Sequence, residues 1–218
     1  NFGIKFFCEK AYDFVIFSDQ DSVSSTSLIR NIVEAYFVLS KETNIACIGP
    51  MPINRKTGLP YIYERSIIER CERNGIKYYK MYSIISSYSL FPTHIFSEIG
   101  TMDERLFIDF VDQQWCWKAA LKKKSCIMLP GQTISHELGV ATKFLGVNIS
   151  VSSPFRIYYQ TRNLLWLCRK DYVPSFWKKK NLAKLFFKFF YYSAIPRQRL
   201  LYCRRMLRGI VDGFSDNL

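Results

Sequence analysis

Two aspartates one residue apart, Asp19 and Asp21, follow a short apolar run and are the first residues whose types and spacing could do chemistry. The run at 14–17 reads Phe-Val-Ile-Phe and predicts a strand buried on both faces of a mostly parallel sheet. Ligands of open α/β sheets bind at the carboxyl ends of strands. We therefore expect both carboxylates to hold one divalent cation, Mg²⁺ or Mn²⁺, beside the two phosphates of a nucleotide.

Three more side chains could take part in the same chemistry: Asp109, Asp112 and His136. Asp109 and Asp112 are three residues apart, so we expect them to share one face in the first turn of a helix. They fit either a functional carboxylate pair or a helix cap with an acid that pairs with the helix dipole. His136 ends an apolar run just before an acid, and fits either a hydrogen-bonded core histidine or a residue facing the same cleft as Asp19 and Asp21.

The elements that must position these residues alternate between strands and helices, which predicts an α/β architecture. Helical spacing and capping residues predict helices at 24–40, 92–100 and 109–124. Strands are predicted at 44–52, within 76–90, at 126–129 and at 133–136, and turn residues predict a polar loop at 52–65.

From about Pro154 the pattern changes to successive helices rich in aromatic residues, lysine and arginine, so we divide the chain into a domain at 1–153 and a helical region at 154–218. The first 117 residues carry 12 Lys and Arg against 14 Asp and Glu, whereas the remaining residues carry 19 against 4. These basic helices fit either a solvated outer face or a surface that lies in the membrane interface. We favour the membrane interface, with aromatic residues inward and Lys184 and Lys188 at the headgroups.

Composition excludes several classes of protein. No run of 18 uncharged apolar residues occurs, so we expect no transmembrane helix. The seven cysteines are scattered without a CxxC pair, as is typical of reduced thiols in a cytosolic protein. No helix-turn-helix, zinc-ligand or RNP-like pattern accompanies the basic half, so we expect no nucleic-acid partner. The chain opens at Asn1 in what reads as the middle of a helix, so we expect a preceding piece to be missing.

Several segments together resemble the family 2 inverting glycosyltransferases of the GT-A fold, most closely the bacterial rhamnosyltransferase branch. The resemblance spans residues 1–170 in the family's order and rests on NFGI, DFVIFSDQDS, SSYSLF, EIGTMDERLFIDFVDQQWCWKA, LPGQTISHELG and RIYYQTRN. It implies a GT-A fold that lacks its first strand, helix, strand unit and is followed by the basic helical region.

The resemblance also implies a role for each matching residue. Asp21 would be the direct metal ligand, Asp19 would lie nearer the ribose, and His136 would complete the metal site. Asp112 matches the catalytic base. The residues matching acceptor-side positions are Ser87, Tyr88, Asp109, Gln114 and Trp115. This chain departs from the family pattern where Tyr88 replaces the usual glycine and Gln114 replaces an acid.

The implied reaction is an inverting transfer of a deoxyhexose, L-rhamnose from dTDP-rhamnose, onto a saccharide carried by polyprenyl diphosphate in O-antigen (lipopolysaccharide) synthesis. The enzyme would be cytoplasmic and peripheral at the inner membrane, with the anionic membrane surface as a partner. The alternative, favoured by Gln114, Tyr88 and the expected missing piece, is a catalytically inactive remnant that acts as a membrane-surface or interaction protein.

Overall fold

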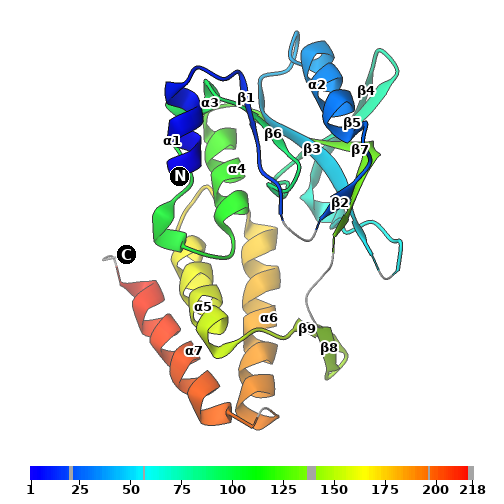
Figure 1. The fold of residues 1–218 in the computed structure, drawn as a ribbon. Coiled ribbons are helices and arrows are strands. Elements are labelled where there is room, and N and C mark those ends of the chain that lie inside the picture. Colours follow the sequence, from blue (N-terminus) through cyan, green and yellow to red (C-terminus); the bar gives the residue numbers. More distant parts are fainter. Residues whose placement is uncertain (20–21, 56, 137–140, 196, 216–218) are drawn as a thin grey trace. The chain divides into compact units, whose positions relative to one another are not determined.

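The computed structural model describes residues 1–19, 22–55, 57–136, 141–195 and 197–215 (Figure 1). The chain forms two compact units, each described here by itself. Unit 1 consists of Asn1–Met102 and Trp115–Glu137, and unit 2 consists of Asp103–Gln114 and Leu138–Leu218. The domain boundary expected near residue 153 therefore falls inside unit 2.

Unit 1 is built on a seven-stranded sheet with the order β1-β6-β3-β7-β5-β4, to which β2 adds by pairing with β7. The strands are β1 (Phe14–Ile16), β2 (Val23–Ser24), β3 (Ile45–Asn54), β4 (Ile67–Arg73), β5 (Ile76–Met81), β6 (Leu90–Pro92) and β7 (Ser125–His136). Among these strands β3 and β7 pair in parallel, and the other pairs are antiparallel. The expectation of a mostly parallel sheet is therefore wrong.

A short connection explains one of the antiparallel pairs. β4 and β5 form a hairpin whose turn residues Asn74 and Gly75 have φ angles of 48° and 76°. Positive φ at both positions is the signature of a tight hairpin turn, and Asn-Gly is the dipeptide that adopts it most readily. The segments predicted as two strands at 126–129 and 133–136 lie in one strand, β7, whose pairing with β3 shifts register between Pro50 and Met51.

Alternating side chains along the strands feed two apolar clusters. Cys126 and Met128 of β7 belong to one cluster, and Ile127 and Leu129 belong to the other. The first cluster includes residues of α1 (Phe2–Glu9), α3 (Ile95–Ile99) and α4 (Val111–Leu121), and the second includes one face of α2 (Leu28–Leu39). The helices predicted from periodicity are thus present, with ends shifted by a few residues.

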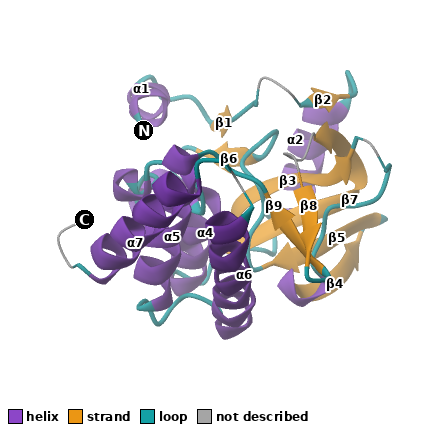
Figure 2. Ribbon diagram, turned by 90° about the horizontal axis from the view of Figure 1, so that it is seen from below, coloured by secondary structure: helices purple, strands orange, loops and turns teal. Residues whose placement is uncertain are grey.

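Unit 2 contains three long helices that lie side by side (Figure 2), and they confirm the helical prediction for the region after 154. They are α5 (Pro154–Cys168), α6 (Ser175–Ala194) and α7 (Arg199–Phe214), and a short hairpin of β8 (Ala141–Phe144) and β9 (Val147–Ser150) precedes them. Within the described residues, no helix combines the length and the apolar character needed to cross a bilayer.

Candidate active site

The loop after β1 carries the first candidate ligand. Val15 is buried, whereas Phe14 and Ile16 are half-buried, so β1 is less enclosed than expected. Beyond β1, Phe17 forms a parallel bridge with Ser87, and the exposed Asp19 follows two residues later. Asp19 therefore lies just past the carboxyl end of β1, where the sequence predicted it.

Ser87 holds this loop in place. Its side chain is 1% exposed, and its hydroxyl donates to Ser22 Oγ at 3.1 Å and accepts from the Asp19 amide at 3.5 Å. The Ser22 amide in turn donates to the Asp19 carbonyl oxygen at 3.3 Å. These contacts make Ser87 a positioning residue for the loop after β1, and its expected role on the acceptor side stays a prediction.

Tyr88 occupies a backbone conformation that suits glycine. Its φ is 55°, in the left-handed region, and its amide donates to the Phe17 carbonyl oxygen at 2.6 Å. Hydrogen bonds with Ser18 and Ser24 lower the pKa of the Tyr88 phenol. Tyr88 thus has a backbone conformation that glycine adopts most readily, while its phenol ties together Ser18 and Ser24, which flank Asp19 and Asp21 in the sequence.

Strand β2 brings the same loop beside the end of β7. Val23 pairs with Ser135 and Ser24 pairs with Ile134, so His136 is the next residue of β7 in the direction of Ser22. His136 also pairs with Asn54 of β3 at backbone level. Unit 1 therefore places the backbone of His136 at the edge where the acidic loop ends, whereas Asp21 lies outside the described residues.

Asp109 and Asp112 belong to unit 2, in the segment that leads into α4. Asp112 lies in the first turn of α4 and is half-buried. Asp109 precedes the helix with a φ of 66°, and its carboxylate accepts two hydrogen bonds from Arg156, at 2.9 Å from Nε and 2.8 Å from Nη2. The expectation that both aspartates share a helical face is therefore wrong, because the bond to Arg156 holds Asp109 in the preceding loop.

Three neighbouring residues of this loop have left-handed backbone, with φ of 59° at Phe107, 66° at Asp109 and 66° at Phe110. Such conformations are costly for residues other than glycine and persist where the surroundings enforce them. Asn163 of α5 supplies this enforcement, because its side-chain amide donates to the carbonyl oxygens of Leu106 and Ile108, each at 2.8 Å.

Arg162 orients that asparagine. Its guanidinium donates to Asn163 Oδ1 at 3.0 and 2.8 Å, so the amide nitrogen of Asn163 must face the loop carbonyls. Arg162 also donates to the carbonyl oxygen of Arg105, and Asn163 is fully buried. Sequence reasoning assigned no role to either residue. The available signal was an arginine and an asparagine side by side, just before the apolar run at 164–167 of a predicted helix.

The three residues that follow Asp112 make side-chain hydrogen bonds within the protein. Gln113 accepts a hydrogen bond from the Trp177 indole at 2.6 Å, and the buried Gln114 donates to the Tyr172 hydroxyl at 3.2 Å. Trp115 is fully buried, and its indole donates to the Gly100 carbonyl oxygen at 2.8 Å. Both side chains are buried and bonded within the protein, and the acceptor contacts expected of Gln114 and Trp115 stay predictions.

Asp109 has a second basic neighbour in unit 2. The Lys188 ammonium donates to Gln160 Oε1 at 2.7 Å, and burial lowers the pKa of Lys188 to about 8 against the opposing effect of the Asp109 charge. The half-buried Lys188 is thus bonded within unit 2, and its expected place at the membrane headgroups stays a prediction.

Solved structures identify the fold. S. aureus TarS with bound UDP-GlcNAc matches at a TM-score of 0.50 and 13% identity, over 95% of this chain and 60% of TarS. The protein has the fold of the GT-A glycosyltransferases. A second TarS structure matches at a TM-score of 0.50 and 13% identity, over 96% of this chain and 36% of that TarS chain. GalNAc-T7 with UDP, GalNAc and Mn²⁺ has a TM-score of 0.45 and 14% sequence identity, over 87% of this chain and 42% of GalNAc-T7. This chain thus spans 60% or less of each solved chain.

Sequence comparison adds a distant homologue to the GT-A fold. The dTDP-rhamnosyl transferase RfbF of Shigella flexneri is 28% identical over 219 residues, which cover 98% of this chain and 73% of RfbF. No protein-family model matches the chain.

Proposed function

We propose that this protein is an inverting, metal-assisted glycosyltransferase that moves a deoxyhexose, L-rhamnose from dTDP-rhamnose, onto a lipid-linked saccharide. The observation that carries the proposal is the anchored acidic loop at the end of β1, with Asp19 bound to Ser87 and the backbone of His136 at the same edge. The GT-A fold and the homology to RfbF over 98% of the chain support it.

The loop after β1, which carries Asp19 and Asp21, is the proposed binding site for the nucleotide-sugar donor. Asp19 and Asp21 supply carboxylate oxygens and His136 supplies an imidazole, a donor set that fits Mn²⁺ or Mg²⁺. When bound, such an ion offsets the negative charge that gathers on a departing nucleoside diphosphate. The Asp19 amide donates to Ser87, whose hydroxyl donates to Ser22, and these bonds hold the loop backbone before any ligand arrives, so less ordering is needed on binding.

Asp112 is the proposed base. In an inverting transfer, the acceptor hydroxyl attacks the anomeric carbon from the face opposite the nucleotide, and one carboxylate takes its proton as the bond forms. Asp109 is held by Arg156. Asp112 lies half-buried in the first turn of α4, and we assign the proton transfer to its carboxylate because it matches the family's catalytic base. Asn163 and Arg156 act as positioning residues because they fix the loop that leads into Asp112.

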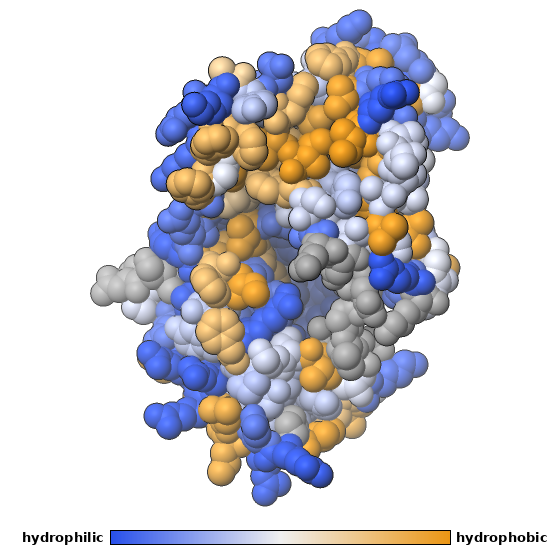
Figure 3. Space-filling model, viewed as in Figure 1, coloured by the Kyte–Doolittle hydropathy of each residue, from blue (hydrophilic) through white to orange (hydrophobic). Residues whose placement is uncertain are grey.

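The surface of unit 2 supports a membrane-bound acceptor. Leu182, Phe186 and Phe190 repeat every four residues along one face of α6 and are 40%, 60% and 47% exposed. Figure 3 shows apolar and hydrophilic residues side by side over the α6 and α7 region of the displayed face. We propose that this mixed surface lies in the headgroup region of the cytoplasmic face of the inner membrane, where the polyprenyl-diphosphate acceptor resides.

Calorimetric titration with dTDP tests the donor site. The protein is expected to bind dTDP when Mn²⁺ is present and to bind it far more weakly in EDTA, because the carboxylates alone repel the diphosphate. Asp21→Asn should abolish the effect of Mn²⁺. The matched control is Asp13→Asn, which changes an exposed aspartate at the start of β1 and should bind as the parent does.

Two results would count against the proposal. Equal dTDP binding with and without Mn²⁺ would remove the metal from the donor site. The absence of any dTDP binding by a folded protein would favour the inactive remnant that acts as an interaction protein.

A further inference from the structure

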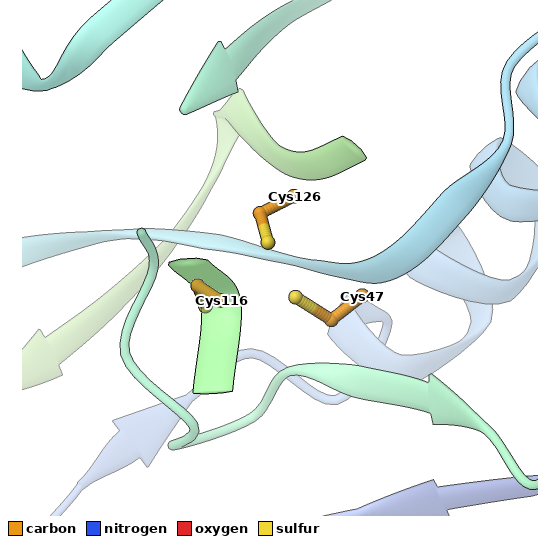
Figure 4. Close-up of side chains that lie close together, drawn as sticks. All are labelled: Cys47, Cys116 and Cys126. Carbon is orange, nitrogen blue, oxygen red and sulfur yellow. The ribbon is translucent and has the colours of Figure 1, made fainter. Parts of the chain in front are cut away.

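Three cysteines far apart in the sequence meet in the core of unit 1. Cys47 of β3, Cys116 of α4 and Cys126 of β7 have sulfur atoms that all lie within 4.8 Å of one another (Figure 4). Their side chains are 0%, 2% and 2% exposed.

The sheet register explains why the sulfurs converge. Met81 of β5 pairs with Cys126, and Cys126 pairs with Cys47, so the three residues form a row across adjacent strands. Paired residues of neighbouring strands point to the same face. All three belong to the apolar cluster that also contains Cys116, so the row faces α4. Three thiols and one thioether thus share a single side of the sheet.

This donor set differs from that of the proposed catalytic site. Among the described residues, no histidine, aspartate or glutamate joins the three thiols, so oxygen-seeking cations such as Mg²⁺ find no ligands there. Structural zinc takes four nitrogen or sulfur ligands, and the group provides three thiols. Thiolate and thioether sulfur select Cu(I), which completes its coordination with fewer ligands.

The charge balance of the buried site also favours Cu(I). Burying uncompensated charge in an apolar core is costly. A monovalent cation needs one thiolate to form a neutral group, whereas a divalent cation needs two. Each thiol that ionises on binding releases its proton to the solvent, and no electron is transferred.

We propose that Cys47, Cys116 and Cys126 are the ligands of a binding site for a soft monovalent cation, Cu(I). The site is separate from the acidic loop in both residues and chemistry, and it does not depend on the proposed glycosyltransferase activity. Cu(I) bound there would link β3, β7 and α4 and would stabilise the folded state of unit 1, because the unfolded chain does not hold the three sulfurs together.

The test is an anaerobic Cu(I) titration of the full chain against a chromophoric Cu(I) chelator. Because the thiols are buried, the ion is supplied while the reduced protein refolds from urea. The parent and the control Cys71→Ala, which removes a half-buried thiol of β4, should each hold one Cu(I) with a three-sulfur signature in X-ray absorption. Cys116→Ala and Cys126→Ala should each bind it at least about 100-fold more weakly, since even outer-shell changes cost 10–100-fold.

Thermal unfolding keeps the test decisive if a core variant folds poorly. Cu(I) should raise the melting temperature of the parent and of Cys71→Ala. Three results would each overturn the proposal. Cys116→Ala could bind Cu(I) as tightly as Cys71→Ala does, the parent could show a two-sulfur signature, or the parent could bind Zn²⁺ more tightly than Cu(I). In those cases the three cysteines serve as small apolar core residues.

Discussion

Asn163 satisfies the most demanding backbone in unit 2. Its amide bonds two carbonyl oxygens of the loop before Asp112, and that loop contains three left-handed residues that are not glycine. The orientation of the amide is fixed in turn by Arg162. The proposed base therefore depends on a buried side chain that need not touch any substrate.

Asn163→Ala should lower both stability and turnover. The carbonyl oxygens of Leu106 and Ile108 would each lose a donor, at a combined cost of about 1–3 kcal/mol in unfolding free energy. We expect kcat to fall while dTDP binding with Mn²⁺ is retained, because the donor site lies in unit 1. Urea unfolding, calorimetry and transfer rates measure these effects. The control is Asn181→Ala, whose amide bonds the carbonyl oxygen of Trp177 in its own helix. An unchanged kcat in Asn163→Ala would show that the loop before Asp112 keeps its position without Asn163.

Lys188 makes stability depend on pH. Its pKa is lowered from 10.5 to about 8 in the folded protein, chiefly by burial. The unfolded chain therefore binds more protons between those values, and the contribution of this group to stability rises as pH increases from 8 towards 10.5.

Lys188→Met should remove that dependence. The variant is expected to be more stable than the parent at pH 7 by about 1–3 kcal/mol, since each pKa unit corresponds to roughly 1.4 kcal/mol, and the lost bond to Gln160 offsets part of the gain. The difference between the two proteins should shrink at pH 9. Urea unfolding at both pH values measures it, and a constant difference would contradict the assignment.

At the scale of elements, α5 and α7 pack through glycine. A Cβ added at Gly209 would lie 2.7 Å from the Tyr158 carbonyl oxygen, and one added at Gly213 would lie 2.8 Å from that of Arg162. These are backbone atoms, so the helices would have to separate. α5 also carries Asn163, and a shift of this helix would therefore reach the loop before Asp112.

Gly209→Ala should destabilise the protein by about 1–3 kcal/mol through overpacking. The matched control is Gly3→Ala in α1, where an added Cβ meets nothing within 4 Å. That change should be neutral or stabilising by roughly 0.5–1 kcal/mol, the helix preference of alanine over glycine. Thermal or urea unfolding compares the two. Equal effects of both substitutions would show that α7 does not pack tightly on α5.

Local patterns in the sequence predicted the helices and the strand that precedes Asp19, because apolar spacing and capping residues act over a few positions. They did not predict that β6 lies between β1 and β3, or that Asp109 leaves the helix. Those features come from pairings with residues far along the chain, such as Arg156. The convergence of three cysteines has the same origin, since it needs the register of β3 with β7.

For the molecule as a whole, charge and exposed apolar surface coincide in residues 118–218. That half carries 19 Lys and Arg against 4 Asp and Glu, and α7 adds Leu200, Leu207 and Val211, which are 81%, 54% and 70% exposed. An exposed surface of this composition suits a membrane whose headgroups are anionic.

The protein should float with liposomes that contain phosphatidylglycerol and should be released by salt. Phe186→Ser with Phe190→Ser should reduce flotation several-fold, because each change removes apolar burial of roughly 1.5–3 kcal/mol. Leu59→Ser, at an exposed apolar residue of unit 1, is the control. Flotation of the double variant at the parental level would show that α6 does not enter the interface.

The central claim is tested most directly by the rate at which the protein transfers rhamnose from dTDP-rhamnose to the lipid fraction of bacterial membranes in the presence of Mn²⁺. Asp112→Asn should reduce this rate by about 10²–10⁴-fold, the usual contribution of a general base, while dTDP binding stays intact. Asp171→Asn, at an exposed aspartate of unit 2, should transfer at the parental rate. Transfer by Asp112→Asn at the rate of the Asp171→Asn control would contradict the account.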